Sequence, residues 1–134
     1  MKIVTQLNYT YISPGSTVLA KGKKADFVYF IKTDSVFVTN EVSSASETDK
    51  FANRVCDLEA GSFFGEASIL FDQASEYSYV ASHQKGHPTE SVQFYTISKE
   101  RFLKICNSYP KFAEFLRNRC IRRQAHWKCY EIAK

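Results

Sequence analysis

The hydrophobic pattern of the sequence changes at Ser98, and this change limits the possible folds more than any other feature. Before Ser98, short runs of β-branched and aromatic residues alternate with turn-forming residues such as Pro14 and Gly15. We expect strands at residues 17–20, 27–31, 36–39, 77–81 and 92–97. Many short strands at near-regular spacing are typical of a sandwich, barrel or roll.

After this point the pattern is helical. Ser98 is a good helix N-cap, and Pro110 interrupts the helix and suits the first turn of a second one. The second helix carries one stripe at three- and four-residue spacing: Phe112, Leu116, Cys120, Arg123, Trp127 and Tyr130. Arg123 is the single cation in this stripe. Either its stem covers apolar surface while the guanidinium reaches water, or the guanidinium faces a ligand.

Composition is that of a soluble globular domain. The chain has 134 residues, 44% apolar and 24% charged, so one core can form without disulfides or metal. No apolar run approaches the roughly 18 residues of a membrane span, and no signal-peptide layout is present. The four cysteines include no C-x-x-C pair, which predicts reduced thiols in a cytosolic compartment and no zinc site. We expect loops at residues 42–50 and 83–90, the first of them mobile.

Charge is unevenly distributed, because residues 98–134 carry a net charge of +7 and residues 1–97 carry −3. A basic helix can bind nucleic acid, an acidic lipid surface or an acidic protein. A solvated helix face explains such charges more often than any of these partners does. Too few residues follow the long helix for a helix-turn-helix, so we expect no nucleic-acid partner.

Residues 58–70, with the sequence LEAGSFFGEASIL, are the most informative segment. Gly65 allows the backbone to approach a ligand closely or to adopt a positive φ. The following residues can begin a short helix whose free N–H groups attract phosphate, with the Glu66 carboxylate beside them for a sugar hydroxyl. A glutamate in a first helical turn is also stabilising without any ligand. The segment therefore predicts either an anion pocket or a capped helix.

Together, these motifs resemble those of the cyclic nucleotide-binding domain family. The similarity begins at residues 12–15 (ISPG), continues through Gly22 and residues 29–31, and is strongest at residues 58–66. Residues 97–110 resemble the B helix of family members attached to ion channels. The Arg-rich helix that follows resembles their lid, or C helix. The resemblance covers nearly the whole chain.

The resemblance implies a mainly β fold with C-terminal helices (α+β). This is an antiparallel β-roll or jelly roll with a short helix in the phosphate cassette and with B and C helices. It implies one domain over residues 1–134, with the roll at 1–97 and the helices at 98–134, as part of a larger chain. It also implies cAMP or cGMP as ligand, with the phosphate on the cassette backbone and the ribose on the glutamate. The implied site residues are Phe64, Gly65, Glu66, Ala67, Ser68, Ser75, Glu76 and Arg123.

The sequence departs from the family pattern at two site positions. Ligand-binding members carry an Arg eleven residues after the Phe of the F-G-E motif, followed by Thr or Ala, and this Arg pairs with the cyclic phosphate. Here the two positions hold Ser75 and Glu76. Such a charge-assisted bond contributes about 1.5–3 kcal/mol, and a carboxylate beside a phosphate repels it. We therefore expect nucleotide affinity to be weak or lost.

Two regulatory functions remain open. In the first, cAMP or cGMP binds the cassette and the C helix closes over the base. In the second, the domain keeps the fold and the coupling role but has lost the ligand. We expect neither catalysis nor a metal site, because His83, His87 and His126 form no cluster of ligands in the sequence.

The basic lid helix and the Tyr109-Pro110 pair favour a potassium or cyclic-nucleotide-gated cation channel as the parent protein. A cyclic-nucleotide-dependent kinase or another effector is the alternative. In a channel, this domain is expected to be cytoplasmic and attached to an integral membrane protein. Its partners are then the upstream pore and the neighbouring subunits of a homotetramer.

Overall fold

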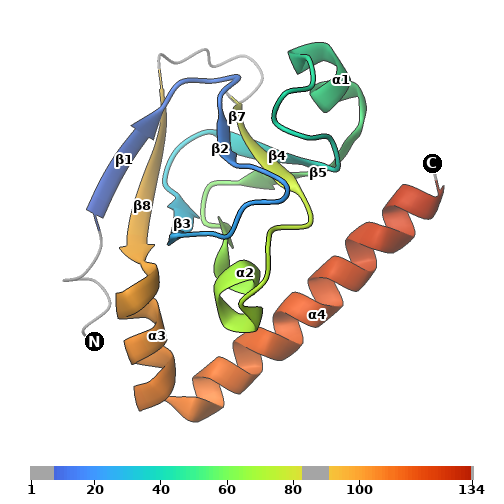
Figure 1. Cartoon of the computed structure of the whole chain (residues 1–134). Coiled ribbons are helices and arrows are strands. Elements are labelled where there is room, and N and C mark those ends of the chain that lie inside the picture. The colour runs from blue at the N-terminus through green and yellow to red at the C-terminus, as the bar shows by residue number, and fades with distance from the viewer. Residues whose placement is uncertain (1–7, 83–90, 134) are drawn as a thin grey trace.

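The computed structural model describes residues 8–82 and 91–133, which form two antiparallel sheets and four helices (Figure 1). The strands are β1 (Asn8–Ile12), β2 (Thr17–Leu19), β3 (Phe27–Ile31), β4 (Ser35–Thr39), β5 (Arg54–Glu59), β6 (Phe63–Phe64), β7 (Ser78–Ser82) and β8 (Val92–Ser98). The helices are α1 (Glu47–Ala52), α2 (Glu66–Phe71), α3 (Lys99–Ser108) and α4 (Pro110–Ala133). One sheet has the strand order β1-β8-β3-β6, and the other has the order β2-β7-β4-β5.

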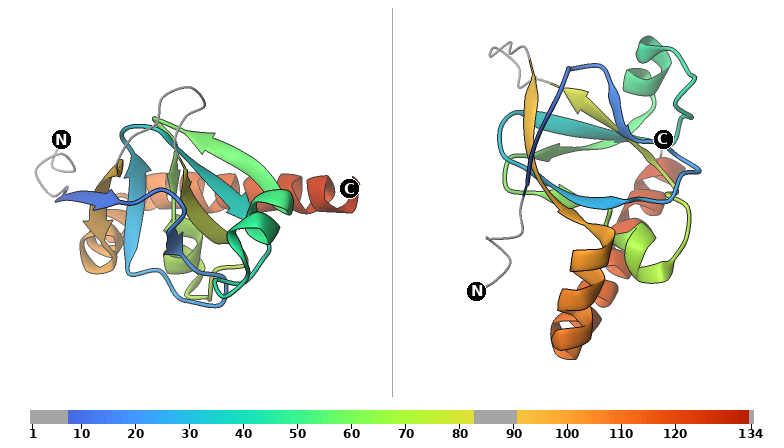
Figure 2. Two further views of the ribbon diagram at one scale, coloured as in Figure 1. Left: turned by 90° about the horizontal axis from the view of Figure 1, so that it is seen from above. Right: turned by 60° about the vertical axis from the view of Figure 1, so that its left-hand side comes forward.

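An aromatic stack in the core joins the two sheets. Phe64 is fully buried, and its ring centroid lies 5.1 Å from that of Tyr29 and 4.5 Å from that of Tyr79. Tyr29 belongs to one sheet and Tyr79 to the other. The strands curl into a roll, and α4 extends along one side of it (Figure 2). The fold is thus the antiparallel β-roll with C-terminal helices that the sequence predicts.

The change of pattern at Ser98 marks the end of the roll, as predicted. The Ser98 hydroxyl accepts a hydrogen bond from the Arg101 N–H and so caps α3. The helix ends before Tyr109, and Pro110 is the first residue of α4. Because α3 packs on β3 and β8 while α4 packs on α2 and β5, the helices bring the C-terminal segment back to the cassette.

Four elements differ from the sequence prediction. The expected loop at residues 42–50 is partly helical, since the Ser46 hydroxyl accepts a hydrogen bond from the Asp49 N–H and α1 begins at Glu47. The sequence also fails to predict β1, β5 and β6. These strands lie at sheet edges, where exposed residues weaken the alternating pattern, and β6 has only two residues. The expected loop at 83–90 lies outside the described residues.

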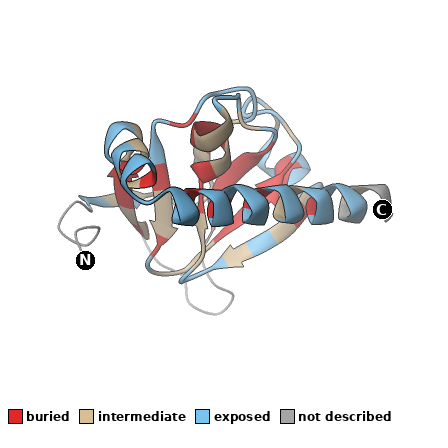
Figure 3. Ribbon diagram, turned by 90° about the horizontal axis from the view of Figure 1, so that it is seen from below, coloured by how far each residue is buried: buried red, intermediate tan, exposed pale blue. Residues whose placement is uncertain are grey.

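The buried face of α4 matches the predicted stripe except at one position. Leu116, Cys120 and Trp127 are buried as predicted, but Phe112 is 40% exposed and Ala113 is buried instead. Ala113 precedes Leu116 by three residues and Cys120 by seven, which places all three on one helical face. The outward face of α4 is exposed along most of its length (Figure 3). The side chain of Tyr130 lies outside the described residues.

Candidate functional site

The cassette comprises residues 64–76. Near its start, the backbone makes a turn that only glycine fits. Gly65 links β6 to α2 in a left-handed conformation, with φ of 96°. A Cβ atom built at this position would lie 2.7 Å from the carbonyl oxygen of Phe27. The sequence-predicted positive φ is therefore present, and the close approach is to the chain's own strand β3. Glu66 follows as the first residue of α2.

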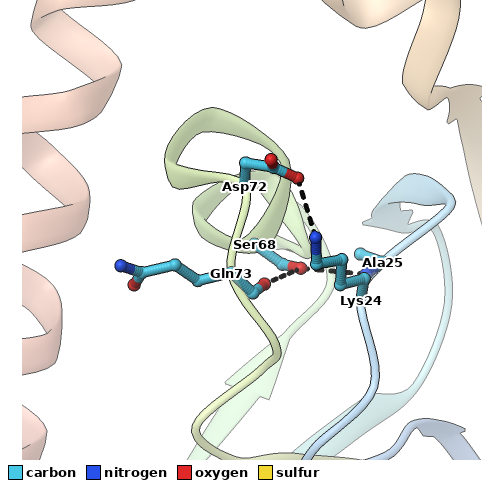
Figure 4. Close-up of polar contacts among 5 residues, drawn as sticks. All are labelled: Lys24, Ala25, Ser68, Asp72 and Gln73. Atoms are coloured by element: carbon cyan, nitrogen blue, oxygen red, sulfur yellow. Dashed lines mark hydrogen bonds and ion pairs between the residues drawn. The ribbon is translucent and has the colours of Figure 1, made fainter.

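Ser68 anchors the cassette to the β2–β3 connection. Its hydroxyl accepts a hydrogen bond from the Ala25 N–H at 2.9 Å and donates one to the Gln73 carbonyl at 2.6 Å (Figure 4). Lys24 and Asp72 add an exposed ion pair at 3.1 Å. The only hydroxyl proton of Ser68 is therefore used inside the protein.

Glu66 is buried, and two residues of α4 contact its carboxylate. Arg123 Nη1 lies 3.3 Å from Glu66 Oε1 and donates a second hydrogen bond, at 2.8 Å, to the Phe63 carbonyl. The Cys120 thiol donates to the same Oε1 at 3.5 Å, and burial raises the pKa of this thiol to about 12, so it stays protonated. The Arg123 guanidinium thus contacts the cassette, and the interpretation in which it faces a ligand stays a prediction.

This ion pair is incomplete. Glu66 Oε2 and Arg123 Nη2 are buried and find no hydrogen-bond partner among the described residues. Burial raises the pKa of the Glu66 carboxyl above its ordinary value, and the Arg123 guanidinium opposes this rise only in part. The site thus holds a carboxylate and a guanidinium that each retain one unused polar atom.

The two positions that the family resemblance assigns to phosphate binding, Ser75 and Glu76, carry no positive charge. The Ser75 hydroxyl donates a hydrogen bond to the Tyr77 carbonyl at 2.7 Å. Glu76 Oε2 instead lies 3.2 Å from Lys128 Nζ of α4. The two residues that depart from the family pattern are therefore held by contacts within the chain.

The remaining space between the cassette and α4 is small. Ala67, Ser75 and Gln124 are among the residues around a cavity of about 20 Å³, which has room for about one water molecule. Tyr79 also lines this cavity, and the Trp127 ring of α4 packs on the aromatic rings beside it, 5.3 Å from Tyr77 and 6.3 Å from Tyr79 between centroids. The chain's own side chains fill the place where the sequence predicts a nucleotide.

The sequence analysis missed several of the residues that fill this space. It assigned no site role to Tyr79, Gln124 or Lys128. Gln124 and Lys128 follow Cys120 by four and eight residues, which is about one and two helical turns, so they share its face of α4. Helical spacing could have found them, whereas only the packing of the two sheets places Tyr79 against Phe64.

The part of the chain that the structure describes contains neither a helix that could span a membrane nor a cluster of metal-ligating side chains. No helix there is long and apolar enough to cross a membrane. No three His, Cys, Asp or Glu side chains in residues 8–82 and 91–133 gather into a group that could hold a metal ion. His83 and His87 lie outside these ranges, and the absence of catalysis stays a prediction.

Comparison with known proteins identifies the fold. No family model matches the chain. It is 28% identical over 104 residues to the cGMP-dependent protein kinase egl-4 of Caenorhabditis briggsae, an alignment that covers 78% of this chain and 13% of the kinase. Among solved structures, the regulatory domain of Toxoplasma gondii PKA with cAMP has a TM-score of 0.69 at 14% identity, over 90% of this chain and 41% of that one.

Two further structures agree with this result. The catabolite activator protein of Thermus thermophilus has a TM-score of 0.70 at 18% identity, over 94% of this chain and 54% of that one. The cAMP-bound PfPKA-R has a TM-score of 0.62 at 17% identity, over 77% of this chain and 32% of that one. The chain has the fold of a cyclic nucleotide-binding domain, and it spans only part of each of these proteins.

Gly65→Ala is expected to destabilise the fold more than the matched control Gly61→Ala. Both glycines have a positive φ, but nothing lies within 4 Å of a Cβ at Gly61, whereas one at Gly65 meets the Phe27 carbonyl. The left-handed conformation alone costs about 1–2 kcal/mol for alanine, and the clash adds to this only at Gly65. Urea denaturation measures the two losses, and equal losses would contradict the packing described here.

Glu66→Gln is expected to change the pH dependence of stability. Because the pKa of Glu66 is raised on folding, its stabilising contribution is complete below pH 4.5, the ordinary value, and is lost as the pH rises through the folded-state pKa. The free energy of unfolding of the wild type should therefore fall relative to that of the variant as the pH rises above 4.5. Urea titrations across this window provide the measurement, with the exposed Glu59→Gln as control. A pH-independent difference for Glu66→Gln would refute the assignment.

Proposed function

We propose that this chain is a regulatory domain of a larger effector protein and that its own affinity for cAMP and cGMP is weak or lost. The observation that carries the proposal is the engagement of Glu66 by Arg123 and Cys120 of α4. A ribose hydroxyl that bonds this carboxylate has to displace both of them. The domain acts in regulation rather than catalysis, through the position of α4.

The phosphate side supports the same proposal. Ser75 replaces the arginine that pairs with cyclic phosphate in ligand-binding members, and the adjacent Glu76 adds a like charge. The volume of the cavity, about 20 Å³, is also far smaller than the roughly 300–1,000 Å³ typical of small-molecule pockets. Helix α4 must therefore leave the cassette before a nucleotide can enter, which couples binding to helix movement.

For the parent protein, we favour a cyclic-nucleotide-dependent kinase or a related effector over an ion channel. The similarity to a cGMP-dependent protein kinase and to PKA regulatory domains supports this choice. One observation favours a channel: Arg123, at the position where channel members place a base-contacting arginine, does face the cassette. The pore, the homotetramer and the membrane-bound location belong to this second candidate.

Isothermal titration calorimetry of the chain with cAMP and with cGMP is expected to give dissociation constants weaker than about 100 μM. The reason is the combined loss of the phosphate-pairing arginine and the competition of Arg123 for Glu66. Arg123→Ala serves as the companion variant, and it should bind no less tightly than the wild type if α4 competes with the ligand. Low-micromolar binding by the wild type would refute the loss of affinity.

The double substitution Ser75→Arg with Glu76→Thr is expected to create cAMP binding that the natural sequence lacks. It adds one charge-assisted contact of about 1.5–3 kcal/mol and removes a nearby like charge. This corresponds to a gain of roughly 10- to 150-fold in affinity. A thermal shift that grows with cAMP concentration detects it. Ser75→Met with Glu76→Thr is the matched control without the new charge, and a shift of equal size in both variants would contradict the argument.

A further inference from the structure

Four aromatic side chains form a row across the outer face of the sheet β1-β8-β3-β6. Strand register pairs Tyr9 with Tyr95, Tyr95 with Phe30, and Phe30 with Phe63, so each strand contributes one member. The ring centroids of Tyr9 and Tyr95 are 4.8 Å apart, and those of Phe30 and Phe63 are 5.7 Å apart. Because side chains alternate along a strand, this aromatic row lies on the face opposite the buried Phe64 and Phe94.

The aromatic row is only partly covered. Helix α3 packs on β3 and β8, where Val28 and Ile97 pair on the same outer face and are buried. The row begins two pairs further along these strands, at Phe30 and Tyr95, and Tyr9 at its end is 54% exposed. Phe30, Phe63 and Tyr95 are half-buried. The row is therefore an accessible strip of apolar surface beside α3; Figure 1 shows its strands β1, β8 and β3 side by side.

A cation lies at each end of the aromatic row. Lys32 Nζ is 4.8 Å from the ring centroid of Tyr9 and 5.7 Å from that of Tyr95. At the other end, Arg119 Cζ of α4 is 5.2 Å from the ring centroid of Phe63. Both cationic side chains are exposed, and neither forms an ion pair with any of the residues that the structure describes. Their positive charges are thus available to a partner that approaches the row.

We propose that the aromatic row docks an amphipathic helix of a partner protein whose apolar stripe carries a carboxylate at each end. Three strand spacings make the row about 14 Å long. An α-helix covers this length with about nine residues, so apolar side chains at i, i+4 and i+7 meet the rings. Acidic residues about nine positions apart then reach Lys32 and Arg119. The Arg119 guanidinium, 5.2 Å from the Phe63 ring centroid, carries several N–H donors and can pair with a carboxylate through two of them.

A designed peptide tests this surface directly. The probe is an alanine-based helix of about 16 residues with leucines at i, i+4 and i+7 and a glutamate pair at each end of that stripe. A second peptide carries lysines in place of the glutamates. Amide chemical shifts of the labelled chain locate the contact, and fluorescence anisotropy measures affinity. The acidic peptide is expected to change the amide chemical shifts of residues in β1, β8, β3 and β6. The basic peptide is expected to leave these chemical shifts unchanged.

Charge-reversal variants complete the test. The double variant Lys32→Glu with Arg119→Glu should reduce the affinity for the acidic peptide by about tenfold or more and should allow the basic peptide to bind. The control, Lys23→Glu with Lys111→Glu, makes the same change in net charge away from the row and should leave the acidic peptide's affinity unchanged. Equal loss in both double variants, no saturable binding, or shifts elsewhere would overturn the proposal. Binding of phosphatidylserine vesicles in place of the peptide, or dimerisation of the chain through the row, would also overturn it.

Discussion

The contact between Glu66 and Arg123 determines how α4 lies on the roll, and the shape of the candidate site depends on it. Both groups are largely removed from water, yet each leaves one polar atom without a partner among the described residues. Removing one member of such a buried pair typically costs about 3–5 kcal/mol, whereas exchanging both for apolar groups is often neutral. The pair joins α4 to the cassette in a docked position in which Trp127 packs on Tyr77 and Tyr79.

The cassette and α4 are held in different ways. The cassette belongs to the core: Phe64 stacks on both sheets, Gly65 touches the β3 backbone, and Ser68 bonds the chain on two sides. Helix α4 meets the cassette through side chains, including Arg123 and the exposed pair of Lys128 with Glu76. Exposed ion pairs contribute about 1 kcal/mol or less. Separating α4 from the cassette would also uncover Ala113, Leu116 and Trp127, which belong to the buried core.

Much of the fold could be predicted because its signals are local. The N-cap at Ser98, the break at Pro110 and the glycine turn before Glu66 each follow from the chemistry of one or two residues. The site's closure could not be predicted in this way. Helical spacing puts Arg123 on the face with Trp127, but whether the guanidinium meets a ligand, water or Glu66 depends on a strand 60 residues away in sequence. Phe112 was misplaced for a similar reason, since hydrophobicity favours the large side chain whereas the helical face selects Ala113.

For the proposed function, the internal ion pairs of Glu66 and Glu76 have an energetic consequence beyond the absence of a phosphate-pairing arginine at position 75. At the sugar end, Glu66 already has Arg123, and at the phosphate end Glu76 already has Lys128. Under the proposed function, a nucleotide binds only the fraction of molecules in which α4 has left the cassette, so the apparent dissociation constant is the intrinsic one divided by that fraction. Each 1.4 kcal/mol or so by which docking is favoured weakens apparent affinity about tenfold. In the proposed function, the equilibrium between docked and undocked α4 is sufficient for regulation. Any partner that prefers one of these two states shifts the equilibrium by the difference in its affinity for them.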